Sequence, residues 1–273
     1  MAEALADLLG DAELVSADSA QVYRGLPVLT NQSPRPAHLV GVWPLAHEAS
    51  VGEYQDLAHA AIDGALERGR TPIVVGGTGL YLRAALAELE LPPPPAAGAR
   101  ERWQALYDER GAEAAHAELA ARDPGAAAAV HPNDRRRVVR ALELAEAGSS
   151  LRPGSDRLWS ESTRHPTLLV GLDVPPDELE RRIERRAAAM FERGVEDEVR
   201  RALAEPLSAT ARKIMGLREV AELPPDEARR SIVVRNRQYA AYQRKWMRRI
   251  PRLVRVDATR PPAEVAAEIA RLL

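Results

Sequence analysis

The feature that most constrains the fold is a glycine-rich turn between a strand and a helix. Residues 72–75 form a short apolar run typical of a buried strand, the sequence GGTG follows at 76–79, and residues 80–89 have a helical pattern. The segment before them, 51–68, also has apolar residues at helical spacing and is followed by Gly69. Strands that alternate with helices indicate a parallel sheet with helices on both faces, so we expect an α/β fold.

The same alternation occurs towards both ends of the chain. Residues 13–17 and 167–174 are further apolar runs typical of strands, and residues 252–256 alternate like a last strand. Helical patterns occur at 3–9, 176–193, 196–203, 211–222, 226–249 and 262–273. We therefore expect most of the chain to form one α/β core.

A proline run at 92–95 marks the expected edge of a separate unit. Beyond it, the helical patterns at 99–109, 112–121 and 133–147 contain no strand candidate. We predict an α/β core of residues 1–95 and 131–273, interrupted by a helical insert of residues 96–130.

Composition narrows the class of protein. The 273 residues include no cysteine, which excludes disulfides and zinc–thiolate sites and fits a reducing cytosol, so we expect a cytoplasmic protein. No apolar run approaches the length of a membrane span, and we expect no membrane partner. No two histidines have the i, i+4 spacing of a helical metal site, so we expect no transition metal.

A carboxylate between two hydroxyls follows the first predicted strand. Residues 14–25 read LVSADSAQVYRG, which places Asp18 between Ser16 and Ser19. Ligands of open α/β sheets bind at the carboxyl ends of the strands, so Asp18 is the first candidate for a reactive side chain. The alternative is that Asp18 or Ser19 only caps the turn that follows.

The GGTG turn is a second candidate. Glycines at this position let backbone N–H groups approach an anion at the start of the following helix, and Thr78 adds a hydroxyl. A tight structural connection would use the same residues, so this alternative stays open.

Two basic segments are candidates for contact with nucleic acid, although the net charge is only −2. In residues 131–143, Arg136 and Arg140 lie on one helical face. Residues 228–256 contain ten Arg or Lys and no acidic residue, and Arg237 lies there with Tyr239, Tyr242 and Trp246 nearby. The alternative for both segments is a solvated helix face, with the aromatic residues in the core.

Six segments, in this order, resemble the tRNA dimethylallyltransferase family: VSADSAQVYRG, GGTGLYLRA, HPNDRRRVVRALE, the helix ending MFERGVEDEV, IMGLRE and NRQYAAYQRKWMRR. The resemblance implies a P-loop NTPase-like core with a helical insert that helps to grip the tRNA anticodon stem-loop. It also implies transfer of a dimethylallyl group from dimethylallyl diphosphate to N6 of the adenosine 3′-adjacent to the anticodon. That base would be flipped out of the loop to reach the donor.

The resemblance also implies residue roles. Asp18 would be the general base that accepts the N6 proton, Thr78 would contact tRNA at the catalytic site, and Arg237 would bind the leaving diphosphate. Magnesium would bridge the diphosphate oxygens, with no protein ligand assigned, and the protein would act as a monomer. The residues expected to contact tRNA are Asp18, Ser19, Ala20, Gln21, Thr78, Arg136, Arg137, Val138, Val139, Arg140 and Gln238.

The chain departs from the family pattern in two places. Residues 26–34 read LPVLTNQSP where the family usually has DIGTAKP, and no G-x-x-x-x-G-K-[ST] Walker A loop is present, since both Lys213 and Lys245 follow an arginine. We therefore expect an enzyme shortened at its N-terminus, with little or no transfer activity and a truncated sheet prone to aggregation. The alternatives are a non-catalytic tRNA-binding relative and a small-molecule phosphotransferase.

Overall fold

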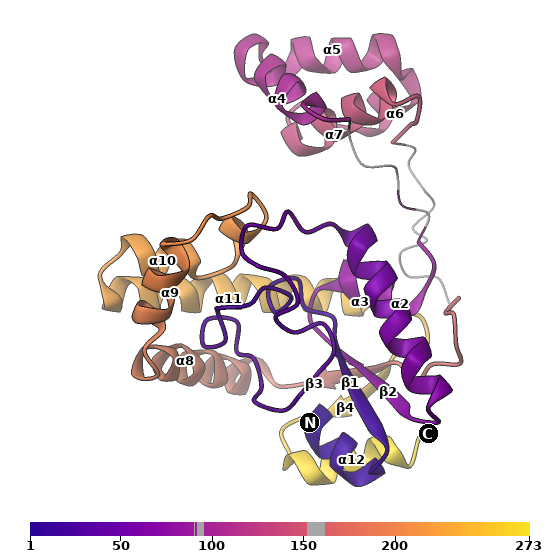
Figure 1. Cartoon of the computed structure of the whole chain (residues 1–273), viewed down its shortest axis with the longest axis vertical. Helices are drawn as coiled ribbons and strands as arrows, with labels where there is room; N and C mark the ends of the chain where they lie inside the picture. The colour runs from indigo at the N-terminus through magenta and orange to yellow at the C-terminus, as the bar shows by residue number, and fades with distance from the viewer. Residues whose placement is uncertain (90, 92–95, 152–161) are drawn as a thin grey trace. The chain divides into compact units, whose positions relative to one another are not determined.

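The computed structural model describes residues 1–89, 91, 96–151 and 162–273 (Figure 1). The chain divides into two compact units, one of Met1–Leu89 with Leu158–Leu273 and the other of Glu90–Arg157. Within the described residues, no helix is both long and apolar enough to cross a membrane.

The first unit contains four short parallel strands. Strand β1 (Ala12–Ser16) pairs with β2 (Thr71–Val75), and β3 (Val170–Asp173) pairs with β4 (Val254–Asp257). The predicted α/β class and parallel pairing are confirmed. The prediction of one sheet is not, because the described strands form two separate two-stranded sheets.

Helices surround these strands in the first unit (Figure 1). Prolines at the first turns of α8, α11 and α12 start those helices, and Ser50 caps α2 by accepting from the Glu53 amide. The helices are α1 (Ala2–Leu9), α2 (Val51–Glu67), α3 (Gly79–Leu86), α8 (Pro176–Glu192), α9 (Val195–Leu203), α10 (Leu217–Glu222), α11 (Pro225–Met247) and α12 (Pro262–Ala270).

One predicted helix is interrupted. Residues 211–222 form a 3₁₀ turn at Ala211–Lys213 and then α10, rather than a continuous helix. Gly216 lies between them with a φ of 91°, a left-handed conformation that breaks a right-handed helix.

The second unit is a bundle of α4 (Ala99–Arg110), α5 (Ala112–Arg122), α6 (Pro124–Ala129) and α7 (Arg135–Glu146). The predicted boundary at residue 130 is wrong, because α7 belongs to this unit. Its residues Val138, Val139 and Leu142 share one core with Trp103 of α4 and Leu119 of α5. The short helix α6 was not predicted. The proline run at 92–95, the predicted edge of the insert, lies outside the described residues.

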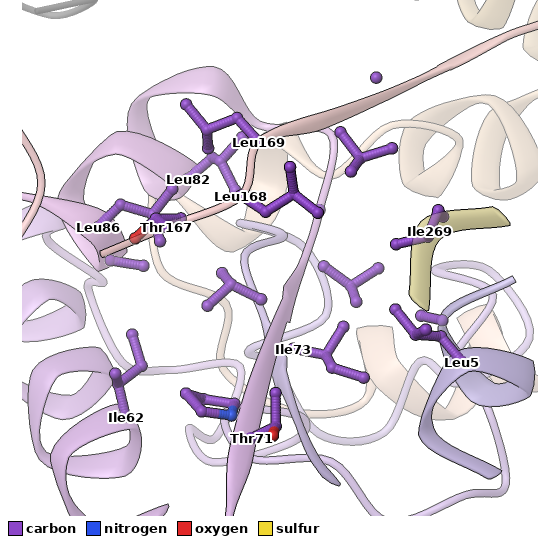
Figure 2. Close-up of a pocket in the computed structure, with 18 of the residues that line it drawn as sticks. Leu5, Ile62, Thr71, Ile73, Leu82, Leu86, Thr167, Leu168, Leu169 and Ile269 are labelled. Atoms are coloured by element: carbon purple, nitrogen blue, oxygen red, sulfur yellow. The ribbon is translucent and has the colours of Figure 1, made fainter. Parts of the chain in front are cut away.

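Strand β2 is less buried than its apolar sequence predicts. None of its five residues is buried, because a cavity of about 770 Å³ lies against it. The cavity is bordered by both β2 and β3, and its lining is mainly apolar, with Leu5, Ile73, Leu168 and Ile269 among the side chains that Figure 2 labels. The two sheets therefore face a common space instead of forming one continuous layer.

Candidate active site

The carboxyl ends of β1 and β2 bring the two sequence candidates together. The Ala17 amide donates to the Val75 carbonyl at 2.7 Å, and a Cβ on Gly76 would lie 2.1 Å from the Ala17 oxygen. Only glycine fits this close approach. As a result the Ser19 amide lies 3.4 Å from Thr78 Oγ1, and the two hydroxyl oxygens are 3.3 Å apart.

Asp18 is half-buried and its carboxylate is oriented by the turn that follows. Its Oδ1 accepts from the amides of Ala20 at 2.8 Å and Gln21 at 3.4 Å. In the part of the chain that the structure describes, Oδ2 has no hydrogen bond. Asp18 therefore caps the turn, which was the alternative interpretation of this residue. Its other carboxylate oxygen is still available to accept a proton.

Helix α11 holds the glycine-rich turn from the other side. Tyr239 Oη and Gln243 Nε2 both donate to the Gly77 carbonyl, at 2.9 and 3.0 Å, and Tyr239 Oη lies 3.3 Å from Thr78 Oγ1. Burial raises the pKa of Tyr239, and the charge of Asp18 adds to this effect. The Tyr239 hydroxyl is therefore protonated at neutral pH.

Two further tyrosines lie within electrostatic reach of Asp18. Burial raises the pKa of Tyr54 and raises the pKa of Tyr81 to about 12, and the Asp18 charge contributes to both. Their rings pack with centroids 4.3 Å apart. Asp18 thus stands near neutral phenols, which do not compete with it as bases at neutral pH.

Arg186 of α8 is a candidate that the sequence analysis missed. Desolvation lowers its pKa and the Asp18 charge raises it, so the two side chains interact, and solvent still reaches Arg186. Among the described residues it has no hydrogen bond or ion pair. A signal was present in the sequence, since Arg186 lies on the apolar face of an amphipathic helix beside Ala187 and Met190, which are buried.

Arg237, the predicted diphosphate ligand, has other partners. It is exposed, and its guanidinium pairs with Glu180 at 2.5 Å and Glu184 at 2.9 Å, both on α8. Its positive charge is therefore already balanced within the protein. Gln238 follows it on α11 and is exposed.

The side chain of Gln21 is engaged inside the protein. It accepts from Ser16 Oγ at 3.0 Å and donates to the carbonyls of Thr30 and Asn31 at 3.1 and 3.2 Å. Gln21 therefore supports the loop of residues 26–34, where the chain departs from the family pattern. Ala20 is half-buried against the core and supplies its amide to Asp18.

In the helical unit, the predicted stretch 136–140 has two kinds of residue. Arg136 and Arg137 are exposed, and over residues 96–151 no hydrogen bond or ion pair holds their side chains. Arg140 pairs with Glu143 at 2.9 Å. Val138 and Val139 are buried and their side chains fill the core of α4–α7, so any contact of this pair with tRNA stays a prediction.

Magnesium is not accommodated by protein ligands alone. Across the described residues there is no group of three or more His, Cys, Asp or Glu side chains that could hold a metal ion. Magnesium is usually bound by one or two carboxylates together with substrate phosphates, so Asp18 alone does not form a magnesium cage.

The fold and site together define a class. Parallel strands whose carboxyl ends carry an oriented carboxylate and a glycine-rich turn form a P-loop-like α/β unit, to which a helical unit is added. Residues 21–250 match the family described as IPP transferase, and the chain belongs to that family.

Relatives and solved structures agree with this assignment. The chain is 42% identical to a tRNA dimethylallyltransferase of Acidothermus cellulolyticus (94% of this chain, 84% of the relative) and 41% identical to one of Streptomyces coelicolor (91% and 83%). A tRNA isopentenylpyrophosphate transferase from Bacillus halodurans superposes with a TM-score of 0.68 at 30% identity, covering 99% of this chain and 90% of that one. A eukaryotic dimethylallyltransferase acting on tRNA, at 24% identity and a TM-score of 0.77, shares the fold over 98% of this chain and 73% of its own.

Proposed function

We propose that this protein transfers a dimethylallyl group from dimethylallyl diphosphate to N6 of the adenosine 3′-adjacent to the anticodon in tRNA. The observation that carries the proposal is the orientation of Asp18. One oxygen is fixed by two amides and the other is available, at the edge where ligands of α/β sheets bind. The names of the relatives support the same reaction.

In the proposed reaction Asp18 acts as the general base. The adenine N6 forms a bond to the first carbon of the dimethylallyl group, and the bond from that carbon to the diphosphate oxygen breaks. The diphosphate leaves with the electron pair, and the N6 proton passes to the available Asp18 oxygen. Because the amine is in a tRNA loop, the base must leave its stack to reach this carboxylate.

The hydroxyls beside Asp18 are suited to hold the adenine. Ser19 and Thr78 present hydroxyl groups 3.3 Å apart on the same side of the turn. A hydroxyl both donates and accepts, so this pair suits the mixed donor and acceptor edge of an adenine ring. We assign Thr78 to this contact within the catalytic site, while Gln21 and Ala20 support the turn from inside the protein.

Two arginines are available for the diphosphate. Arg186 has a charge without a partner among the described residues and interacts with Asp18, so it is the stronger candidate to stabilise the leaving group. Arg237 must exchange Glu180 and Glu184 for the diphosphate before it contributes. Magnesium, expected from the family resemblance, would arrive with the diphosphate, because the described residues do not form a magnesium site.

The exposed arginines of α7 are proposed to contact the anticodon stem-loop. Over residues 96–151 the guanidinium groups of Arg136 and Arg137 have no partner, and such groups suit the phosphates of a nucleic-acid backbone. Gln238 is exposed on α11 and remains a candidate for a polar contact with the loop. One copy of the chain, in the cytoplasm, would bind one tRNA.

The test is a transfer assay on an anticodon stem-loop RNA. The protein is incubated with dimethylallyl diphosphate and a stem-loop that has adenosine at the 3′-adjacent position, and mass spectrometry detects the prenylated nucleoside. A stem-loop with guanosine at that position and the Asp18→Asn variant are the controls, and neither should give product. Binding of the stem-loop without transfer would instead favour the non-catalytic tRNA-binding alternative, or the low activity that the sequence predicts from the missing Walker A loop.

A further inference from the structure

The carbonyl of Gly77 is held by two side chains of one helix. Tyr239 and Gln243 are four positions apart on α11 and so lie on the same face, and both donate to this oxygen. A carbonyl oxygen has two lone pairs, so two donors at 2.9 and 3.0 Å saturate it. One donor would satisfy this half-buried carbonyl, so the second donor is a further restraint on the turn.

The contact between Gln243 and the turn leaves no room for a side chain at Gly77. A Cβ there would lie 2.1 Å from Gln243 Nε2. Gly77 is not among the glycines with a positive φ, so its backbone does not require glycine for conformational reasons. Glycine is needed at position 77 because the Gln243 amide must reach the backbone.

This restraint extends to the reactive side of the turn. The Gly77 carbonyl belongs to the same planar peptide unit as the Thr78 amide, so fixing the carbonyl fixes the direction in which Thr78 begins. The Tyr239 hydroxyl, which holds the carbonyl, also lies 3.3 Å from Thr78 Oγ1, and that oxygen lies 3.3 Å from Ser19 Oγ. A single chain of contacts thus runs from α11 to the residue next to Asp18.

We propose that Gln243 and Tyr239 are positioning residues, which hold the Gly77–Thr78 peptide so that the Thr78 hydroxyl faces the adenine as Asp18 takes its proton. This inference rests on the proposed prenyl transfer. Gln243 and Tyr239 act through Thr78, which is one RNA contact among several, so their loss is expected to lower the rate of the bound complex more than the affinity for RNA. A small displacement of a positioned group is enough to slow such a step.

The test is a double-substitution cycle on positions 77 and 243. Gly77→Ala places a methyl group where the Gln243 amide lies, and Gln243→Ala removes that amide. Each single variant is expected to lower kcat by roughly tenfold, from loss of a hydrogen bond and displacement of Thr78, with a clearly smaller change in the dissociation constant for the stem-loop. In the double variant the methyl group has space, so kcat should equal that of Gln243→Ala alone.

Two further variants complete the design. Tyr239→Phe removes the second donor and is expected to lower kcat in the same way, with a smaller effect on RNA affinity. Val234→Ala, an exposed position on the same helix, is the matched control and should behave as the wild type. A double variant whose loss equals the product of the two single losses would overturn the inference, as would an unchanged kcat for Gln243→Ala.

Melting temperatures of the same four proteins, the wild type, the two single variants and the double variant, separate a failure of this inference from a failure of the proposed function. If the wild type transfers no prenyl group, the proposed function fails and the positioning role fails with it, while coupling in the melting temperatures still reports the contact. If the wild type transfers the group and the cycle in kcat is additive, only the positioning role fails.

Discussion

At the scale of single residues, the ability of an arginine to stabilise a leaving anion depends on whether its charge is already neutralised. Arg237 has two glutamate partners, whereas Arg186 is solvent-exposed, interacts electrostatically with Asp18 and has no hydrogen-bond or ion-pair partner in the described ranges. A guanidinium that is already in place and has no counterion can stabilise a developing negative charge without first breaking an ion pair. We therefore propose that Arg186, more than Arg237, stabilises the leaving diphosphate.

This shift can be measured by comparing two neutral substitutions. Arg186→Gln is expected to lower kcat by about 100-fold, the usual effect of removing one donor to a transition-state anion. Arg237→Gln is expected to lower it less, because Glu180 and Glu184 already offset that charge. Steady-state kinetics with saturating stem-loop RNA give the comparison, and a larger loss for Arg237→Gln would contradict it. Arg186→Lys keeps the charge without the planar fork and should lie between wild type and Arg186→Gln.

The sequence allowed one part of this site to be predicted and not the other. Asp18 and Thr78 follow two strands of a parallel pair, and the ends of such strands meet at one edge, so their proximity follows from the pattern. Which face of α8 points to that edge depends on tertiary packing. Arg186 therefore could not be placed from spacing, although its position beside buried Ala187 and Met190 was a signal.

At the scale of elements, α7 shows why the domain boundary was misplaced. The HPND stretch, residues 131–134, resembled a functional motif and was assigned to the core. The apolar face of the helix that it starts, with Val138, Val139 and Leu142, has its partners on α4 and α5. Helical periodicity predicts that a face is buried and does not tell which other helix covers it.

The two faces of α7 should respond differently to substitution. Arg136→Ala with Arg137→Ala is expected to weaken stem-loop binding and to reduce its salt dependence, because two phosphate contacts are lost. Val138→Ala should lower the free energy of unfolding by on the order of 2 kcal/mol and leave the salt dependence unchanged, because it removes buried methyl groups. Fluorescence anisotropy at several salt concentrations and thermal melts measure these effects. Loss of RNA affinity in a folded Val138→Ala protein would instead support its predicted role as a tRNA contact.

A pH-sensitive contact joins α2 to the segment before β3. Arg164 donates to both oxygens of Asp63, at 3.1 and 2.8 Å, and His165 Nε2 lies 2.8 Å from Oδ1. The hydrogen bond from Arg164, then that from His165, lowers the Asp63 pKa from 3.8 to about 2. A carboxyl with a lowered pKa in the folded state stabilises the protein above its unfolded pKa, and this stability is lost as pH falls towards 2.

Asp63→Asn tests that contact. The variant should melt at a lower temperature than the wild type at pH 6, and the difference should shrink as pH falls from about 4 towards 2. The effect is expected to be modest, because the Asp63 side chain is 37% exposed and water screens the pair. Asp56→Asn, on the same helix, is the control. A melting difference that does not change with pH would show that Asp63 acts through packing instead of charge.

At the scale of the whole molecule, each of the two sheets has a strand edge without a partner among the residues that the structure describes. The hydrogen bonds of Thr71 to Asp11 and of Ala17 to Val75 direct the odd-numbered residues of β2 towards β1. Val74 therefore points its backbone groups to the opposite edge, where the described chain provides no hydrogen bond. Pro72 faces the same edge, which is where a strand tolerates a residue without an N–H.

Strand β3 repeats this arrangement on the far side of the cavity. Val254 donates to Leu169 and Ala258 to Asp173, so the backbone of Leu172 is directed away from β4. The strand positions were predictable from short apolar runs. That β2 and β3 would stand apart was not, because such runs give no information on which strands become neighbours.

These open edges lead to a prediction about association. Val75 and Leu172 are 40% and 44% exposed, beside unpaired backbone groups and an apolar cavity of about 770 Å³. Exposed edges of this kind pair with other chains, so we expect the protein to self-associate as its concentration rises and to bind a hydrophobic dye. The variant with Val75→Lys and Leu172→Lys should stay dispersed with an unchanged circular dichroism spectrum, since lysines on an edge oppose pairing. Sedimentation velocity over a concentration series measures this. A wild-type protein that stays monomeric at every concentration, melts sharply and binds no dye would show that the edges are protected.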